Sequence, residues 1–135
     1  MIVADSSAWI EYLRGTGSPA HVALRAAVEA DEVTVPELVK AELLVGARSA
    51  SEFRELQRML EHFDVMLVAP RDDFDSAVAL HQLCRTAGVS PRGLIDCTIA
   101  AMAVRAGLPV LHHDRDLAAI ASVADLAQVP GSLAR

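Results

Sequence analysis

Short apolar segments alternate with longer segments of helical periodicity along almost the whole chain. Strands that alternate with helices pair as a parallel sheet, because each crossover helix returns the chain to the same end of the sheet. We therefore expect an α/β fold, an α/β/α sandwich around a central, mostly parallel sheet of about five strands. The strands are expected at residues 1–4, 32–35, 65–68, 110–111 and 126–129.

Helical segments are recognised by apolar residues that recur at intervals of three and four. Ser6 or Ser7 is expected to cap the first helix, and Pro36 suits the first position of the third. The helix at residues 94–106 is apolar on nearly every side, which predicts burial. The other helices are expected at residues 8–13, 21–30, 37–47, 52–63, 72–87 and 117–120.

Size and composition indicate one globular domain over residues 1–135. Aromatic residues make up only 4% of the chain, so the core must consist of smaller aliphatic side chains. No apolar run approaches the roughly 20 residues of a membrane span, and no basic leader precedes the first strand, so neither a span nor a signal peptide is expected. Cys84 and Cys97 fall in predicted helices without metal-ligand spacing, which favours reduced, packed thiols and a cytoplasmic location.

Five acidic residues lie within apolar stretches or directly after them. They are Asp5, Glu42, Asp96, Asp114 and Asp116. A buried carboxylate without a partner is costly and is usually paired with a cation or bound to a metal. Without these five, 13 acidic residues stand against 12 lysines and arginines, so they account for nearly all of the net charge of −6. The pattern predicts a carboxylate site for Mg²⁺ or Mn²⁺.

Each of the five acids also has a possible structural role, and the first two lie in the first half of the chain. Asp5 directly follows the first strand, where a parallel sheet gathers its functional residues, but aspartate is also a common helix cap. Glu42 stands at i+4 from Leu38 on the edge of an apolar helix stripe, so it should face the core or a cleft. The alternative is a Glu42 side chain that snorkels to solvent or forms a salt bridge with Lys40 or an arginine.

The remaining three acids lie in the second half of the chain. Asp96 is in the first turn of the apolar helix, where the helix dipole alone would favour an acid. Asp114 and Asp116 follow a strand, where an ordinary acidic turn is the alternative. The set of five, rather than any single member, predicts the metal site.

Several neighbouring polar residues have weaker assignments. Ser7 could orient Asp5 or contact a metal-bound water, and Arg92 could hold a phosphate; helix capping and a plain surface arginine are the alternatives. His112 and His113 are adjacent at a strand end and should point to opposite faces, so zinc binding is not expected. Packing or a supporting role is more consistent with both histidines.

Taken in order, four blocks of the chain resemble those of the PIN-domain ribonucleases. The blocks read IVADSSAWIEYL, PELVKAELLVGA, RGLIDCTIAAMAVRAG and VLHHDRDL. They are most similar to the VapC toxins of bacterial VapBC toxin–antitoxin pairs, and the resemblance spans essentially the whole chain. By position, Asp5, Glu42, Asp96 and Asp114 match the acidic quartet of that family, Asp116 the additional acid and Ser7 the small polar residue. Leu117 departs from the aromatic residue that often follows the last acid.

The resemblance implies a PIN-like fold and a Mg²⁺- or Mn²⁺-dependent endoribonuclease acting on structured RNA, such as tRNA or rRNA. It also implies a toxin that is neutralised by a VapB-type antitoxin, with frequent homodimers and toxin–antitoxin hetero-oligomers. The antitoxin's C-terminal segment would lie on helices of residues 20–30 and 37–63, with a basic residue over the acids. The alternative is a catalytically silent PIN-fold module that binds RNA or protein, although five acids would not favour RNA binding. A phosphotransfer domain is disfavoured because Ser7 stands where a second acid would be expected.

Overall fold

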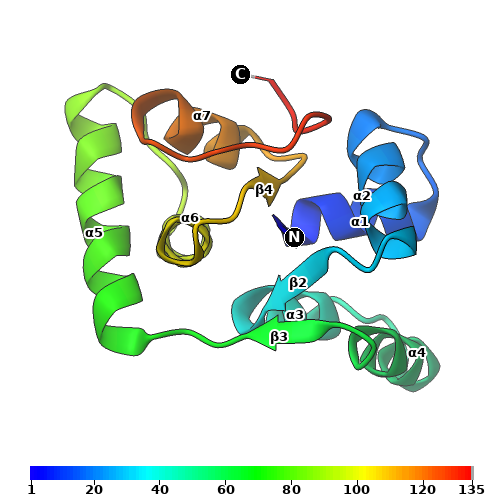
Figure 1. Cartoon of the computed structure of the whole chain (residues 1–135). Coiled ribbons are helices and arrows are strands. Elements are labelled where there is room, and N and C mark those ends of the chain that lie inside the picture. Colours follow the sequence, from blue (N-terminus) through cyan, green and yellow to red (C-terminus); the bar gives the residue numbers. More distant parts are fainter. Residues whose placement is uncertain (135) are drawn as a thin grey trace.

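The computed structural model describes residues 1–134 as a series of strands and helices that largely alternate (Figure 1). The strands are β1 (Ile2–Ala4), β2 (Val33–Pro36), β3 (Asp64–Met66) and β4 (Val110–Leu111). The helices are α1 (Ser6–Arg14), α2 (Pro19–Glu29), α3 (Glu37–Val45), α4 (Ala50–Leu60), α5 (Pro70–Thr86), α6 (Leu94–Ala106) and α7 (Arg115–Val123). None of the described helices is both long enough and apolar enough to cross a membrane.

The strands form one parallel sheet in the order β3-β2-β1-β4. Val3 in β1 pairs with Thr34 of β2 on one side and with Val110 of β4 on the other. Because all four strands run in the same direction, their carboxyl ends lie along one edge of the sheet. That edge is where parallel sheets carry their functional residues.

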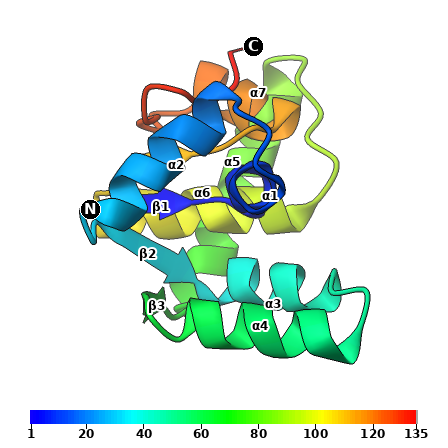
Figure 2. The same cartoon turned by 90° about the vertical axis from the view of Figure 1, so that its right-hand side faces the viewer.

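Helices pack on both sides of the sheet, as an α/β/α arrangement requires. Figure 1 shows α5 and α6 on one side of the strands and α1 and α2 on the other. Figure 2, turned by 90°, shows α3 and α4 together at the β2–β3 end of the sheet. The expected α/β fold with a mostly parallel sheet is therefore confirmed.

The core consists mainly of small aliphatic side chains, as the low aromatic content predicts. The central strands contribute fully buried residues such as Val3 and Leu111. Within α6, every residue from Cys97 to Ala103 is buried. Trp9 is also fully buried and makes edge-to-face contacts with Tyr12 and Phe63. Cys84 and Cys97 are free and buried, in agreement with the expected packed thiols.

Two local predictions were wrong. Asp5, not Ser6 or Ser7, caps α1, because its side chain accepts a hydrogen bond from the backbone N–H of Ser7. Residues 126–129 do not form a fifth strand. Only Gln128 bridges to Val110, since β4 is two residues long and the chain turns away at Pro130 and Gly131.

Several helix boundaries also differ from those expected. Helix α7 extends from Arg115 to Val123 rather than over residues 117–120 alone, because Asp114 caps it earlier. Pro36 is the N-cap of α3 rather than its first residue. Helix α4 begins at Ala50, directly after the Ser49 cap, and ends at Leu60.

Candidate functional site

The five predicted acids come from four separate segments that meet at the carboxyl edge of the sheet. Asp5 follows β1, Glu42 lies on the helix after β2, Asp96 is in the first turn of α6, and Asp114 and Asp116 begin α7. The electrostatic coupling of Asp96 with each of the other four shows that all five share one region. We call Asp5, Glu42, Asp96, Asp114 and Asp116 the acid site.

Asp5 is the most deeply buried member of the acid site, with only 3% of its surface exposed. Its Oδ2 accepts hydrogen bonds from the backbone N–H of Ser7 at 3.0 Å and from the Ser7 hydroxyl at 2.5 Å. Its Oδ1 is buried and has no hydrogen-bond partner among the described residues. Burial raises the pKa of Asp5, although the bonds from Ser7 act in the opposite direction.

Asp96, Asp114 and Asp116 form the tightest group of carboxylates in the site. One oxygen from each lies within 4.8 Å of the others, and all three residues are half-buried. Oxygen atoms at such separations can ligate one hard divalent cation, directly or through water. Asp96 reaches this position as the third residue of α6 after the Gly93 cap, as its place in the sequence predicts.

The electrostatics of the acid site disfavour full ionisation without a cation. Burial, together with the charges of the four other acids, raises the pKa of Asp96 to about 7. Burial and the nearby Asp5 also raise the pKa of Glu42. In the described residues no lysine or arginine forms an ion pair with Asp5, Glu42, Asp96 or Asp114. The site therefore holds more negative charge than its own surroundings neutralise.

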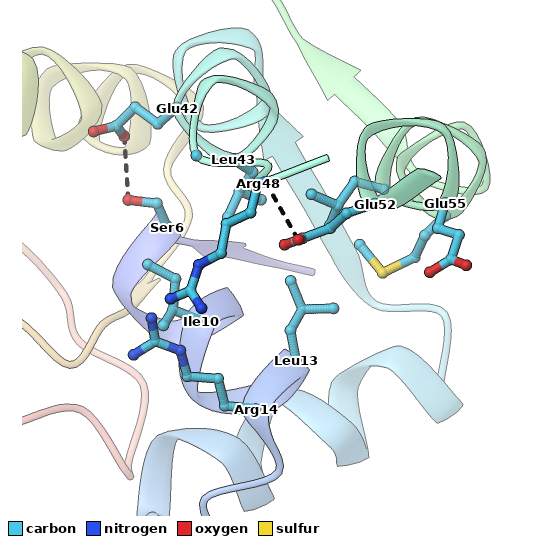
Figure 3. Close-up of a pocket in the computed structure, with 12 residues that line it drawn as sticks. Ser6, Ile10, Leu13, Arg14, Glu42, Leu43, Arg48, Glu52 and Glu55 are labelled. Atoms are coloured by element: carbon cyan, nitrogen blue, oxygen red, sulfur yellow. Dashed lines mark hydrogen bonds between the residues drawn. The ribbon is translucent and has the colours of Figure 1, made fainter. Parts of the chain in front are cut away.

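Glu42 is held at the edge of the acid site by α1. Its Oε1 accepts a hydrogen bond of 3.2 Å from the Ser6 hydroxyl, as the dashed line in Figure 3 marks. The alternative salt bridge with Lys40 or an arginine is absent from the described residues. Ser6 was missed as a partner in the sequence because 36 positions separate the two residues and no local pattern links them.

The loop after β4, which carries Asp114, forms hydrogen bonds with both α1 and α7. The backbone N–H of His113 donates to the Ser7 hydroxyl at 2.9 Å, which joins this loop to α1. The Asp114 side chain caps α7 by accepting from the Leu117 N–H at 3.0 Å. His112 is fully buried and His113 lies 3.6 Å from Glu11, so the two imidazoles face different surroundings. Both fit the packing or supporting role expected from the sequence.

Arg92 lies beside the acid site at its solvent side. Its backbone N–H donates to Asp116 Oδ2 at 3.1 Å, and its Nε lies 3.9 Å from the same oxygen. The Arg92 side chain is 93% exposed. An exposed pair of this kind contributes little to stability, which leaves the guanidinium free to contact an anion near the carboxylates.

These features fit a divalent metal ion in both charge and geometry. The unpartnered buried Oδ1 of Asp5 and the clustered carboxylates of Asp96, Asp114 and Asp116 are hard oxygen ligands, and their few protein donors leave most of the negative charge unneutralised. Such ligands suit Mg²⁺ or Mn²⁺ rather than a metal that prefers sulfur or imidazole.

A groove of about 760 Å³ opens next to the acid site between α1, α3 and α4 (Figure 3). Glu42 and Ser6 line it, together with the apolar side chains of Ile10, Leu13, Leu43, Leu56 and Met59. The side chains of Arg14 and Arg48, which also line the groove, point toward one another in Figure 3. Two more acids, Glu52 and Glu55, come from α4.

Comparison with known proteins identifies the family. The PIN-domain family model matches residues 2–123. The chain is 36% identical over 128 residues to ribonuclease VapC11 of Mycobacterium tuberculosis, covering 93% of this chain and 96% of that protein.

Several solved structures have a similar fold. They include FitAcB from Neisseria gonorrhoeae (TM-score 0.74, 21% identity, 97% of this chain and 98% of that one). A second is VapBC-5 of the VapBC toxin–antitoxin family from Mycobacterium tuberculosis (TM-score 0.65, 24% identity, 95% and 98%). The chain belongs to the PIN-domain family and, within it, to the VapC ribonucleases.

Proposed function

We propose that this protein is a Mg²⁺- or Mn²⁺-dependent endoribonuclease and the toxin of a VapBC-type pair, acting in the cytoplasm on structured RNA such as tRNA or rRNA. The observation that carries the proposal is the convergence of five carboxylates at the carboxyl edge of the sheet, where only the exposed Arg92, beside Asp116, forms an ion pair with any of them in the described part of the chain. Family membership supports the same reaction, because the curated relatives are named as ribonucleases.

Each residue of the acid site has a distinct part in this proposal. Asp96, Asp114 and Asp116 would hold the ion together with the free oxygen of Asp5. When bound, the metal supplies an activated water and stabilises the charge that develops on the phosphate. Ser7 fixes the orientation of Asp5 through its two hydrogen bonds.

Two further residues would act on the substrate side. Glu42 has a raised pKa and belongs to both the acid site and the groove lining, so it is suited to accept a proton from the attacking water. The exposed guanidinium of Arg92 is suited to contact a phosphate beside Asp116, since arginine binds phosphate oxygens in a bidentate manner.

Cleavage assays with purified protein test the enzymatic proposal. Wild-type protein should cut total RNA with Mg²⁺ or Mn²⁺ and lose activity with EDTA. Asp5→Asn and Asp96→Asn should each reduce the rate by about 10²- to 10³-fold, because each removes several kcal/mol of transition-state stabilisation. Sequencing RNA ends after brief expression of wild type and Asp5→Asn would identify the substrate.

Asp75→Asn is the matched control for this assay, since Asp75 is exposed on α5 and lies outside the acid site. It should cleave at the wild-type rate. Cleavage that persists in the Asp5→Asn/Asp96→Asn double variant would refute the metal mechanism. Growth arrest that survives the loss of both acids would instead favour a silent PIN-fold module that acts by binding.

The groove between α1, α3 and α4 supports the antitoxin part of the proposal. Its lining is apolar with charges of both signs, three glutamates and two arginines, which suits a protein segment better than a polyanionic RNA. Glu42 belongs to both the groove lining and the acid site, so a basic residue of a segment bound in the groove could reach the acids. Helix α1 lines the groove where the sequence suggested residues 20–30, which the lining does not include. The proposed occupant is the C-terminal segment of a VapB-type antitoxin.

A charge placed on the groove floor tests this docking site. Leu56→Asp should weaken inhibition by the co-expressed antitoxin without changing RNA cleavage, because Leu56 lies in the groove but not in the acid site. Val104→Asp on the outer face of α6 is the control, since Val104 is exposed and lies outside this groove. Inhibition that is unaffected by Leu56→Asp, or by deletion of the antitoxin's C-terminal tail, would contradict the assignment.

A further inference from the structure

The segment after α7 returns along β4 and surrounds His112. Val110 donates its N–H to the Ala127 carbonyl, and Val129 donates its N–H to the Val110 carbonyl, both at 2.9 Å. This segment lies beyond residue 123, where the match to the PIN-domain family model ends. We call residues 125–134 the C-terminal segment.

The C-terminal segment binds both the backbone and the side chain of His112. The backbone N–H of His112 donates to the Ser132 hydroxyl at 3.2 Å, and its carbonyl accepts from the Leu133 N–H at 3.1 Å. The imidazole is fully buried, and its Nε2 lies 2.7 Å from Oε1 of Gln128. His112 is therefore held on three sides by residues that follow α7.

Close packing against α2 holds the C-terminal segment in this position. Gly131 has a φ of +107°, and a Cβ there would lie 2.9 Å from the Pro19 carbonyl oxygen and 3.1 Å from the Ala23 Cβ. Only glycine permits both this φ and this approach. The segment therefore lies directly on α2.

The hydrogen bonds of His112 define its tautomer. An amide oxygen can only accept, so the Nε2 that faces Gln128 Oε1 must carry the hydrogen. Nδ1 then has a free lone pair, and it accepts the backbone N–H of Asp114 at 3.2 Å. Both contacts therefore require the single ring hydrogen of the neutral imidazole to lie on Nε2 and not on Nδ1.

We propose that Gln128, acting through His112, is a positioning residue for Asp114, so that the C-terminal segment supports the metal-binding carboxylates from behind. The Asp114 backbone is held by His112, and one oxygen of its side chain is held by the Leu117 N–H. These two contacts restrict the direction in which the remaining oxygen can point. This inference rests on the proposed metal-dependent function. Mutation of residues that orient metal ligands in this way commonly lowers metal affinity as well as activity.

A double-mutant cycle with Mn²⁺ as the probe tests the proposed route. Gln128→Leu removes the acceptor and should weaken Mn²⁺ binding, measured by electron paramagnetic resonance, by about tenfold, at the lower end for residues that orient metal ligands. The kcat for RNA should fall with it while KM stays unchanged. His112→Asn keeps an acceptor near the position of Nδ1 but has no group at the position of Nε2. In the His112→Asn background, Gln128→Leu should therefore have less than about a twofold effect, since coupling through His112 is lost.

Gln82→Leu on α5 is the matched control, because Gln82 is exposed and is not a member of the acid site or of the contacts around His112. It should leave Mn²⁺ affinity unchanged. The proposal is overturned if Gln128→Leu lowers the melting temperature but leaves Mn²⁺ affinity within twofold of wild type. It is also overturned if the same loss of affinity occurs in the His112→Asn background.

A measurement without metal separates this inference from the proposed function. ¹⁵N spectra of the imidazole should show Nε2 protonated and Nδ1 unprotonated in wild type. In Gln128→Leu, the Asp114 amide resonance should shift and the tautomer should become mixed. A wild-type protein that shows these signals but neither binds Mn²⁺ nor cleaves RNA would refute the proposed function and leave the His112 contact established. An Nδ1-protonated His112 in wild type would overturn the positioning proposal alone.

Discussion

Two almost completely buried aspartates in this protein have opposite surroundings. Asp73 is 1% exposed and Asp5 is 3% exposed. Asp73 accepts hydrogen bonds from Arg105 Nε at 2.8 Å, Arg105 Nη2 at 3.0 Å and the Ala69 N–H at 2.7 Å. Asp5 accepts hydrogen bonds from Ser7, but its second oxygen has no partner among the described residues and its charged neighbour Asp114 is acidic.

The pKa shifts of the two residues follow from this difference. Burial alone would raise both, but the bonds from Arg105 and Ala69 hold the pKa of Asp73 below its usual range. The pKa of Asp5 is raised, because no cation offsets its burial and Asp114 lies nearby. The fold thus neutralises a buried acid where the role is structural and leaves the acids at the strand ends without a counter-ion. The comparison supports the proposal that the acid site binds a cation from outside the chain.

Replacing each aspartate by asparagine should give the largest difference between the two sites, measured as the change in the free energy of unfolding. Asp73→Asn leaves Arg105 without its charged partner and should lower the free energy of unfolding by about 2–3 kcal/mol. This is less than the about 3–5 kcal/mol of a fully buried pair, because Arg105 is 40% exposed. Asp5→Asn should leave metal-free protein as stable as wild type or more stable, since it removes a buried charge. Urea denaturation in EDTA measures both, and equal destabilisation by the two changes would contradict the comparison.

The stability of the metal-free protein should depend on pH, and the pKa shifts in the acid site determine the direction of that dependence. The pKa of Asp96 is raised to about 7 in the fold, against about 3.9 in an unfolded chain. The folded protein binds more protons between these values, so metal-free stability should fall as pH rises from about 4 to about 7, and it should be lower at pH 8 than at pH 5.5. Asp5 and Glu42 shift in the same direction. The lowered pKa of Asp73 acts oppositely, with stability lost on acidification, but only below about pH 4.

Saturating Mn²⁺ at pH 8 should restore this stability, by about 2.7 kcal/mol at a hundred times the dissociation constant. Melting temperatures with and without Mn²⁺ at the two pH values measure the effect. Asp96→Asn should flatten the pH dependence and reduce the response to Mn²⁺. A wild-type melting temperature that responds to neither pH nor Mn²⁺ would argue against a preformed metal site.

The smallest expected effect concerns Arg92, which borders the acid site without neutralising it. Arg92→Gln should change the free energy of unfolding by less than about 0.5 kcal/mol, because the side chain is 93% exposed. The KM for RNA should rise by about two- to fivefold with kcat unchanged, if one phosphate contact of about 0.5–1 kcal/mol is lost. Arg71→Gln on α5 is the control for a general loss of positive charge. An unchanged KM would identify Arg92 as an ordinary surface arginine.

Local signals in the sequence were sufficient to predict the order of the elements. The apolar run before Asp5, the Pro36 directly before the third helical segment and the mainly apolar helix around Asp96 depend on neighbouring residues only. The same signals failed for residues 126–129, where composition favours a strand but the partner strand β4 is two residues long. They also misassigned the cap of α1, because Asp5, Ser6 and Ser7 are all good caps and the chain geometry selects one.

The sequence by itself determined which residues are acidic, where they stand relative to the strands, and that the fold is a parallel α/β sheet. These properties follow from periodicity, turn residues and the direction of parallel strands, all of which are local or topological. The tertiary structure alone decided the contacts across long separations: Ser6 with Glu42, Arg105 with Asp73, and Gln128 with His112. Such pairs depend on how helices pack, and no short-range pattern records them. The same packing decides that one buried aspartate has a counter-ion and another does not.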